Sequence, residues 1–468
     1  MKIKLILAAS HDDPLRKNDP FMPLSLPILA GAAPDHEYSF VDLLWEDSVG
    51  FEDPVDLVGI SARYSAENRA YEIAGEFRKR GVKVVMGGPQ ISSVPHRAKQ
   101  FADAVAVGEA EELWPVIVRD AAENRLRDFY VTSPAPFDAK GRSLYQLKSY
   151  PQFKTNPMPL RHVYKKNYRF DTVFAARGCP MDCDFCSVPA LFGSQFRPKP
   201  VRDVVAEIET FRNYYYILDD TVFGRPSTYD YYLNLYRAIG SLKKKRYWTG
   251  QGTLDAVGNE RGRGVIRAAA DSGLLYAAIG MESVNPATLQ KSGAIKKTGA
   301  ADPAGAIEKM KEHIRFIQDL GIIVSGWFVL GYDDDTIDTY YRTLDFCLET
   351  NIIPVIFPVT ALPGTKLYER LKRENKLDES KLINYRNPRI DDAEVYDALK
   401  YIARTGFSAK QILKNIGFYL PRFGGDRIHK TVFLAVLQAK LKQGIGVAND
   451  IFVPGRQSPE KLKPGAEK

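Results

Sequence analysis

Residues 177–186 read RGCPMDCDFC and carry Cys179, Cys183 and Cys186, three of the four cysteines in a chain of 468 residues. Three thiolates can ligate three irons of a cubane cluster and leave the fourth iron open, whereas a closed structural site for zinc or a cluster takes four ligands. An iron without a protein ligand can bind a substrate or a cofactor. The CxxxCxxC spacing therefore predicts an open iron–sulfur site.

Other uses of these cysteines fit the chain less well. Three clustered cysteines cannot pair completely, and so few cysteines in a long chain are typical of a reducing compartment, which argues against a disulfide framework. Structural zinc would need a fourth ligand, and the context of His162, the nearest histidine, does not recommend it. Cys347 lies in DTYYRTLDFCLET (338–350), where we expect a buried, inert thiol in a helix.

The cysteine loop directly follows the first of six apolar segments that alternate with stretches of helix length. Such alternation predicts a partial (β/α)6 barrel over residues 171–365, and sites on barrels of this kind lie at the carboxyl ends of the strands. Asp219 and Asp220 end the second strand, so they should lie near the cysteines. The predicted strands are DTVFAA (171–176), YYYILDD (214–220), RYWTGQG (246–252), LLYAAIGME (274–282), IIVSGWFVLG (322–331) and PVIFPVT (354–360).

A second alternation precedes the barrel and predicts a doubly wound, Rossmann-like domain over residues 1–125. Ligands of such domains gather beyond the carboxyl ends of the parallel strands, where Ser61, Arg63 and the turn 87–89 should lie. The longest predicted helices are 65–81 and 109–124. The predicted strands are KIKLILAA (2–9), YSFVDLL (38–44), DLVGISA (56–62), VKVVMGGP (82–89) and DAVAVG (103–108).

Two further regions complete the predicted α/β organisation. Prolines accumulate between residues 126 and 170, which predicts an ordered connector. Residues 366–468 form a helical C-terminal region with a basic tail, and its last residues, GRQSPEKLKPGAEK (455–468), are expected to be disordered.

The net charge of +8 is concentrated at the C-terminal end. Residues 401–468 carry 12 lysines and arginines against four aspartates and glutamates, while the other 400 residues carry 53 of each sign. No module of interleaved basic and aromatic residues indicates nucleic acid binding. The start, MKIKLILAAS, has too short an apolar run for a signal peptide, and no stretch is apolar enough to span a bilayer, so we expect a cytoplasmic protein.

The last predicted helix, DRIHKTVFLAVLQAKLKQ (426–443), leaves two interpretations open. Apolar side chains cover much of its circumference and basic residues edge them, a pattern that suits a peripheral contact with a membrane interface. Packing against its own domain is the commoner use of such a helix. The apolar set is Ile428, Val432, Phe433, Val436, Leu437 and Leu441, and the basic set is Arg427, Lys430, Lys440 and Lys442.

A CxxxCxxC loop after the first strand of a six-unit barrel, with an aromatic residue just before the third cysteine, resembles the radical S-adenosylmethionine (SAM) superfamily. The resemblance implies that Cys179, Cys183 and Cys186 bind a [4Fe–4S] cluster and that Phe185 packs on the adenine of SAM. It also implies that the amino and carboxylate groups of SAM chelate the open iron. Chelation places the sulfonium against the cluster, which shortens the path of the electron that breaks its C–S bond.

Other matches to the superfamily extend along the barrel. Asp219 and Asp220 stand where the family handles the amino group of the methionine moiety, although helix capping is the alternative use of such a pair. Glu282 resembles the carboxylate that binds the ribose hydroxyls or the methionine end. The residues that resemble the border of the adenine site and the turn after the sixth strand are Gly326, Gly331 and the segment LPGT (362–365).

The N-terminal domain resembles the cobalamin-binding domain that precedes the barrel in one large branch of the superfamily. Members that use a histidine as the lower ligand of cobalt carry DxHxxG after the first strand. Here His11 lies in that region, but Ala9 stands in place of the aspartate and Pro14 in place of the glycine, so this ligation is not expected. Glycines let a backbone approach a flat macrocycle closely. The candidate cobalamin contacts are Ser61, Arg63, Gly87, Gly88, Pro89, Gln90 and Gly108.

The two resemblances cover about 360 residues and imply a radical SAM enzyme that cleaves SAM reductively to a 5'-deoxyadenosyl radical. Its first expected reaction is cobalamin-dependent C-methylation of an unactivated carbon. The alternatives are radical cyclisation, C–C coupling or rearrangement without methyl transfer, and a non-catalytic protein in which the cluster is structural. The expected partners are an electron donor such as flavodoxin or ferredoxin and a substrate that is lipid-like or a pigment precursor; catalytic acid and base residues are not assigned.

Overall fold

The structure is a computed structural model that describes residues 1–11, 13, 16–17, 19–132, 156–164, 168–379, 381 and 383–449. Most of the predicted connector and the predicted disordered tail lie outside these residues. The chain packs as two compact units. The N-terminal unit comprises residues 1–252, 261–274 and 362–369, and the C-terminal unit comprises residues 253–260, 275–361 and 370–468.

The N-terminal unit begins with a six-stranded sheet in which every strand pairing is parallel, as the sequence predicts. Its strands are β1 (Lys2–Ala8), β2 (Glu37–Asp42), β3 (Leu57–Ala62), β4 (Lys83–Gly87), β5 (Ala104–Val107) and β6 (Phe129–Val131). The order β2-β1-β3-β4-β5-β6 reverses direction beside β1, which is the point where doubly wound sheets bind ligands. Strand β6 was not predicted, because three residues are too few to show a hydrophobic pattern.

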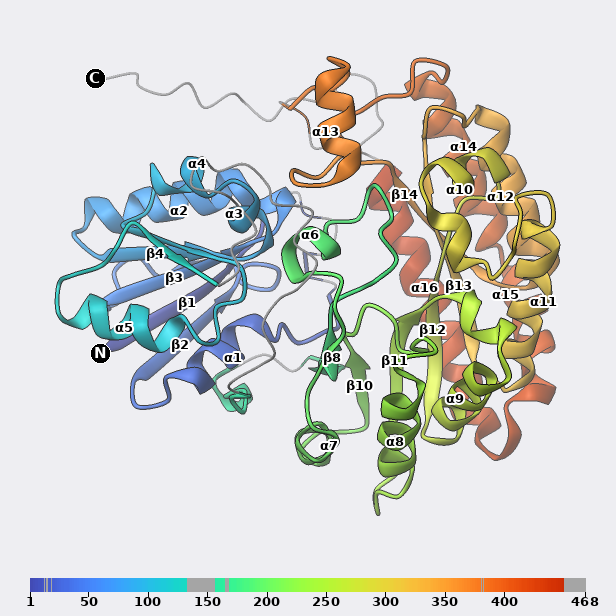
Figure 1. Cartoon of the computed structure of the whole chain (residues 1–468), viewed down its shortest axis with the longest axis horizontal. Coiled ribbons are helices and arrows are strands. Elements are labelled where there is room, and N and C mark those ends of the chain that lie inside the picture. Colours follow the sequence, from blue (N-terminus) through green and yellow to red (C-terminus); the bar gives the residue numbers. More distant parts are fainter. Residues whose placement is uncertain are drawn as a thin grey trace. The chain divides into compact units, whose positions relative to one another are not determined.

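Both faces of this sheet are covered by helices, which explains why its strands are nearly continuous apolar runs (Figure 1). Helix α2 packs on β1, β3 and β4, while α1 and α5 contact each other. The helices are α1 (Ser25–Ala32), α2 (Glu67–Lys79), α3 (Pro89–Ser93), α4 (Pro95–Lys99) and α5 (Trp114–Ala122). The buried core formed between these layers includes Phe77 and Trp114.

The N-terminal unit also contains the first three strands of the predicted barrel. These are β7 (Asp171–Val173), β10 (Tyr214–Ile217) and β11 (Tyr247–Gly252), in the parallel order β7-β10-β11. A short antiparallel pair, β8 (Ala176–Arg177) and β9 (Arg197–Pro198), follows β7. The helices of this part are α6 (Val188–Phe192), α7 (Val201–Glu209), α8 (Tyr229–Gly240) and α9 (Glu260–Asp271).

The C-terminal unit carries the other three predicted strands and most of the C-terminal helices. The strands β12 (Leu274–Glu282), β13 (Ile323–Leu330) and β14 (Ile353–Pro358) pair in parallel in this order. The first helices are α10 (Pro286–Lys291), α11 (Ala306–Asp319) and α12 (Ile337–Thr350), and the later ones are α13 (Lys366–Arg373), α14 (Asp392–Gly406), α15 (Ala409–Tyr419) and α16 (Arg427–Asn449). The first residues of α13 belong to the N-terminal unit.

Buried polar contacts join the C-terminal helices of this unit to its strands. The Tyr419 hydroxyl accepts a hydrogen bond from the backbone N–H of Val324 in β13, at 3.0 Å. Asn415 of α15 donates to Gln438 of α16 at 2.8 Å, and both side chains are buried. Within the described residues, no helix combines the length and hydropathy needed to cross a bilayer.

Candidate active site

The cysteine loop lies at the carboxyl end of β7, as the sequence predicts. It begins directly after β8 and leads into α6. Cys179 and Cys183 are buried, whereas Cys186 and Phe185 are half-buried. The backbone N–H of Cys186 donates to the carbonyl of Cys183 at 3.2 Å, so the C-terminal half of the loop is a turn.

Gly178 allows the loop to leave β8 in a conformation that L side chains rarely adopt. Its φ is +94°, and a Cβ atom at this position would lie 2.0 Å from the carbonyl oxygen of Gln195. The next residue, Cys179, donates its N–H to the carbonyl of Gly193 at 3.2 Å. The backbone of 193–195 therefore lies so close to the start of the loop that only glycine fits.

The start of α13 holds the other side of the cysteine loop. Lys366 Nζ lies 2.6 Å from Asp182 Oδ2, and the N–H of Leu367 donates to the Asp184 carbonyl at 2.9 Å. Asp182 itself has a φ of +57°. The LPGT turn before α13 thus places the start of this helix against the cysteine loop. The sequence had indicated the turn but not this contact.

The cysteines do not form a preformed metal cage. Among the described residues, no three Cys, His, Asp or Glu side chains stand close enough together to hold a metal ion as they are. Metal binding and local ordering are coupled, since the ligating thiols lose their protons and converge only as the metal binds. Ligation by Cys179, Cys183 and Cys186 therefore stays a prediction, supported by the chemistry of three thiols in an eight-residue loop.

The Asp219 carboxylate holds the strand that leads into the cysteine loop. Its Oδ1 accepts hydrogen bonds from the backbone N–H groups of Ala175 and Ala176, at 2.7 and 3.0 Å, and its Oδ2 accepts from the Tyr232 hydroxyl at 2.8 Å. Burial raises the pKa of Asp219 to about 6. This carboxylate caps backbone donors, which is the alternative use noted for the aspartate pair, although capping here serves a strand end rather than a helix.

Asp220 faces a large cavity within the N-terminal unit. The cavity has a volume of about 590 Å³ and is mostly apolar. One side is formed by the carboxyl ends of β3, β4 and β5, and another by residues 21–29. The cavity also reaches Phe174, Ala176, Arg177, Leu191, Phe192, Tyr216, Leu218 and Asp220, which surround the cysteine loop and the end of β10.

Six of the seven residues predicted to contact cobalamin line this cavity: Ser61, Arg63, Gly87, Gly88, Pro89 and Gly108. Gln90 is buried instead and donates to the Glu67 carboxylate. Gly88 has a φ of +95°, and a Cβ there would lie 2.8 Å from Ser61 Oγ. Because these glycines have no side chains, a flat macrocycle could lie directly against the backbone of the cavity wall.

The remaining candidates for binding SAM lie in the C-terminal unit. Glu282 has a φ of +64° at a bulge in β12, and its Oε1 lies 2.6 Å from Lys297 Nζ. A Cβ on Gly326 would lie 2.7 Å from the Phe328 ring, so glycine is required by packing. Gly331 has a φ of +102°. Their contacts with SAM stay predictions.

Cys347 has the inert character expected of it. It is fully buried in α12, and burial raises the pKa of its thiol well above the ordinary value. A neutral thiol is neither a good nucleophile nor a metal ligand.

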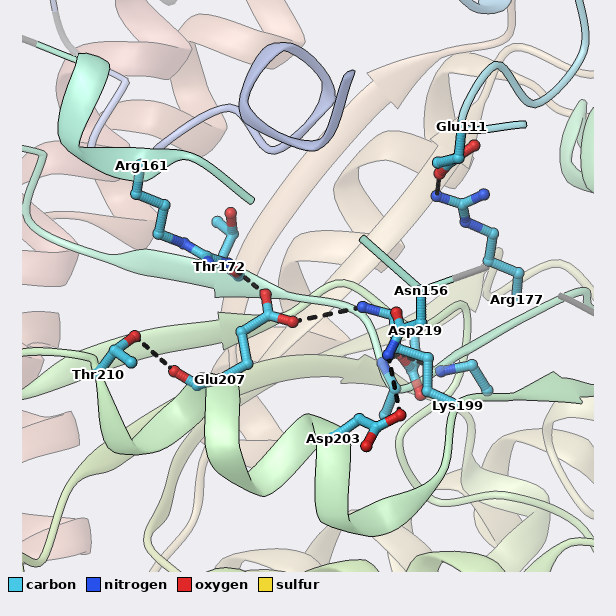
Figure 2. Close-up of polar contacts among 12 residues, drawn as sticks. Glu111, Asn156, Arg161, Thr172, Arg177, Lys199, Asp203, Glu207, Thr210 and Asp219 are labelled. Atoms are coloured by element: carbon cyan, nitrogen blue, oxygen red, sulfur yellow. Dashed lines mark hydrogen bonds and ion pairs between the residues drawn. The ribbon is translucent and has the colours of Figure 1, made fainter. Parts of the chain in front are cut away.

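A set of buried ionisable side chains around the cysteine loop was not predicted from the sequence. Glu109 and Glu111 pair with Arg177 and Arg197. Figure 2 shows the contact between Glu111 and Arg177. The signals were the acidic run GEAEE after a strand and an arginine directly before Gly178, but only the fold reveals that they meet.

A second buried pair, Lys199 and Glu207, lies close to β7 (Figure 2). Lys199 Nζ lies 3.4 Å from Glu207 Oε2, and burial lowers the pKa of Lys199 despite the opposing effect of Glu207. Arg161 also contacts the Glu207 carboxylate and donates to the Thr172 carbonyl at 2.6 Å. Residue 161 thus ties the described end of the predicted connector to β7 and α7.

We predict that Gly178→Ala sharply lowers the iron and sulfide content of protein reconstituted with both. The methyl group would clash with the Gln195 carbonyl, and the left-handed conformation alone costs about 1–3 kcal/mol. Iron and sulfide analysis after anaerobic reconstitution measures the effect. Gly75→Ala is the matched control, because a Cβ on Gly75 would meet no atom within 4 Å. Equal iron content in the two variants would contradict the assignment.

We predict that Asp219→Asn changes how the stability of the cluster-free protein depends on pH. The folded carboxyl titrates near 6 and the unfolded one near 3.8, so the stabilisation from its protonation is present below pH 3.8 and is lost as pH rises through 6. The loss amounts to roughly 3 kcal/mol. The variant should therefore gain stability relative to wild type between pH 4 and pH 7, seen as a larger free energy of unfolding. Parallel stability curves from urea denaturation would disprove the assignment.

Comparison with known proteins shows what this chain resembles. Residues 173–347 match the model of the radical SAM superfamily. A curated relative, bacteriochlorophyllide d C-8(2)-methyltransferase of Chlorobaculum tepidum, is 27% identical over 409 residues, which are 82% of this chain and 81% of the relative.

Two solved structures share the fold at 16% sequence identity. The radical SAM methyltransferase TsrM of Kitasatospora setae, with cobalamin and a [4Fe–4S] cluster bound, superimposes with a TM-score of 0.61 over 80% of this chain and 78% of its own. The cobalamin-dependent SAM radical enzyme OxsB, with aqua-cobalamin bound, gives a TM-score of 0.56 over 80% of this chain; the match spans 55% of the OxsB chain, about half its length.

These findings confirm the resemblance read from the cysteine loop and the strand pattern. A radical SAM domain uses a [4Fe–4S] cluster and SAM, and the cysteine loop lies within the matched residues. The chain carries a radical SAM domain over residues 173–347 and is an enzyme.

Proposed function

We propose that this enzyme is a cobalamin-dependent radical SAM C-methyltransferase that acts on an unactivated carbon. The observation that carries the proposal is the cavity of about 590 Å³ in the N-terminal unit. Its lining joins the glycine-marked strand ends of the Rossmann-like sheet to the residues around the cysteine loop. A methyl donor held in the first part and a radical formed beside the second would share one cavity.

The residues around the cysteine loop fit the cluster and SAM. Cys179, Cys183 and Cys186 would hold three irons, Phe185 would pack on the adenine, and Asp220 would accept a hydrogen bond from the methionine ammonium. When bound, the cluster with SAM supplies a 5'-deoxyadenosyl radical that removes a hydrogen atom, and cobalamin supplies the methyl group. The apolar lining that includes Phe174 and Leu218 would keep water from the radical.

The opposite wall fits a corrin that lies on the backbone. Gly87, Gly88 and Gly108 line it, and Arg63, held by Asp13 at 3.0 Å, offers a cation to the phosphate or amides of the corrin side chains. Among the described residues that line the cavity there is no histidine. We therefore propose that cobalt is bound without a histidine ligand, in agreement with the missing DxHxxG motif.

The relatives support the same reaction class. The curated relative from Chlorobaculum tepidum is a methyltransferase of bacteriochlorophyllide d, and TsrM is a methyltransferase with cobalamin and a cluster bound. A reductant and a substrate are required. We propose flavodoxin or ferredoxin as the electron donor and a lipid-like molecule or pigment precursor as the substrate, because the lining of the cavity is mostly apolar.

The proposal predicts that two cofactors can be removed independently. Protein reconstituted anaerobically with iron, sulfide and hydroxocobalamin should bind corrin and, with a strong reductant, convert SAM to 5'-deoxyadenosine. Cys183→Ala should abolish 5'-deoxyadenosine formation but retain corrin. Gly88→Val should lose corrin but retain iron, because its side chain would collide with Ser61 and Ala62. Absorption spectra, iron analysis and chromatography of nucleosides measure these outcomes.

Two results would overturn the proposal. A wild-type protein that binds no corrin would exclude cobalamin-dependent methylation. A wild-type protein that forms 5'-deoxyadenosine in the presence of its substrate without S-adenosylhomocysteine would favour cyclisation, coupling or rearrangement. Gly75→Ala is the matched control, since it alters a glycine of α2 that has no neighbour within 4 Å of the added Cβ.

We further propose that α15 and α16 contact an anionic membrane surface. Ile428, Val432 and Val436 follow each other at intervals of four residues on α16 and are 83%, 57% and 44% exposed. One face of α16 is thus an exposed apolar stripe, while Leu434 and Gln438 of the same helix are fully buried. Both earlier interpretations of this helix therefore have support, each from a different face.

Charge favours a lipid surface as the occupant of the apolar stripe. Arg427, Lys440 and Lys442 are exposed on α16, and Lys410 and Lys414 are exposed on α15 beside Leu413, which is 67% exposed. Each basic residue near an anionic membrane contributes about 1 kcal/mol to binding. An apolar stripe flanked by lysines suits an interface where acyl chains lie below anionic headgroups.

The membrane proposal predicts co-sedimentation with vesicles that contain phosphatidylserine, weakened by salt. The double variant Ile428→Asp/Val432→Asp should bind at least about tenfold less, because two charges would replace the apolar stripe. Val131→Asp, at a valine that is 40% exposed in the N-terminal unit, is the matched control. The proposal would be wrong if the double variant bound as well as the control variant, or if wild type bound equally to vesicles without anionic lipid.

A further inference from the structure

The cysteine loop is attached to the wall of the cavity by four ionisable side chains. We infer that Glu109, Glu111, Arg177 and Arg197, here called the carboxylate–arginine bridge, position the cluster-binding loop against the corrin wall, so that a ligand in the cavity also orders the loop. The inference rests on the proposed function, since it assigns a role to residues between the two proposed cofactors.

Glu109 contacts both arginines of the bridge, and Glu111 contacts one of them. Glu109 Oε2 accepts from Arg197 Nη1 at 2.8 Å, and Glu109 Oε1 lies 3.4 Å from Arg177 Nη1. Glu111 accepts from the other terminal nitrogen of Arg177 (Figure 2). Arg177 and Arg197 are direct partners across the β8–β9 pair. Two guanidinium groups on neighbouring strands thus meet two carboxylates from one loop.

Burial makes this arrangement sensitive to the loss of any member. The side chains of Arg197, Glu109, Glu111 and Arg177 are 1%, 9%, 12% and 19% exposed. A buried ion pair tolerates little misplacement, because a charge left without its partner keeps its full desolvation cost. Burial alone would raise the pKa of Glu111, but the charge and hydrogen bond of Arg177 lower it overall. The bridge therefore depends on the exact placement of its four side chains.

The position of the bridge relates it to both proposed cofactor sites. Glu109 and Glu111 follow Gly108, whose φ of +87° turns the chain at the end of β5. Arg177 precedes Cys179 by two residues. Glu109, Glu111 and Arg177 all line the cavity. A molecule that presses on this wall therefore acts on side chains joined to the first residues of the cluster loop.

Further contacts restrict the loop end of the bridge. The Arg177 guanidinium lies 4.1 Å from the centroid of the Phe174 ring, and Lys199 Nζ lies 3.7 Å from the same centroid. The Phe174 ring also lines the cavity. Because Asp219 holds the backbone of Ala175 and Ala176, the segment before the cysteines has few ways to move except together with the bridge.

Hydrogen exchange tests the inference with hydroxocobalamin as the probe. In wild type, adding hydroxocobalamin should slow amide exchange in peptides that cover residues 177–186 by at least about fivefold, the low end of measured couplings between sites. In Glu111→Gln the corrin should still bind, as judged by its absorption spectrum, but the slowing in 177–186 should disappear. Glu111→Asp, which keeps the charge, should restore part of it.

Controls separate this role from general stability. Glu52→Gln removes the same charge from an exposed pair with Arg80 outside the cavity and should behave as wild type. If Glu111→Gln does not fold, Arg197→Lys provides a second test, because it keeps the charge but loses the planar fork that Glu109 binds.

The outcomes distinguish the inference from the proposed function. If wild type binds no hydroxocobalamin, the proposed function fails, and the inference fails with it. If wild type binds hydroxocobalamin but exchange in 177–186 does not change, or changes equally in Glu111→Gln, the inference alone is overturned. Loss of slowing in Glu111→Gln with corrin still bound, and its return in Glu111→Asp, would establish the bridge as a positioning element.

Discussion

The site depends on the hydrogen bonds that the buried Asp219 carboxylate accepts at the end of β7. Parallel pairing with β10 ends at Val173, so the next backbone N–H groups need other acceptors. Asp219 supplies one for Ala175 and Ala176, and Tyr232 donates to its second oxygen. The chain can therefore leave the sheet in a defined direction and enter the cysteine loop.

Beyond Asp219, close packing and ion pairs fix the position of the cysteine loop. Gly178 permits the approach of the 193–195 backbone, the start of α13 contacts Asp182 and Asp184, and the carboxylate–arginine bridge ties Arg177 to the end of β5. Three different kinds of contact thus act on ten residues. Arg177, the first residue of this segment, lines the cavity, so the start of the loop and the wall beside the proposed methyl donor share one set of contacts.

Particular residues show where sequence reasoning was sufficient and where it failed. The cysteine spacing and the glycines at the ends of β4 and β5 depend on local chemistry, and six of the seven candidate corrin contacts indeed share one cavity. Gln90 follows them in sequence but is turned away to pair with Glu67. The four residues of the bridge were not recognised, because their partners are 66 and 88 residues apart along the chain.

The sequence by itself determined the class of chemistry and the α/β class of the fold. Three cysteines at CxxxCxxC spacing and the alternation of apolar segments with helices are local patterns, so they can be read without a fold. Only the tertiary structure decided that Asp219 caps a strand end while Asp220 faces the cavity, and that an exposed apolar stripe remains on α16. Which way a side chain points depends on partners that are distant in sequence, because burial and hydrogen bonding are properties of the packed chain.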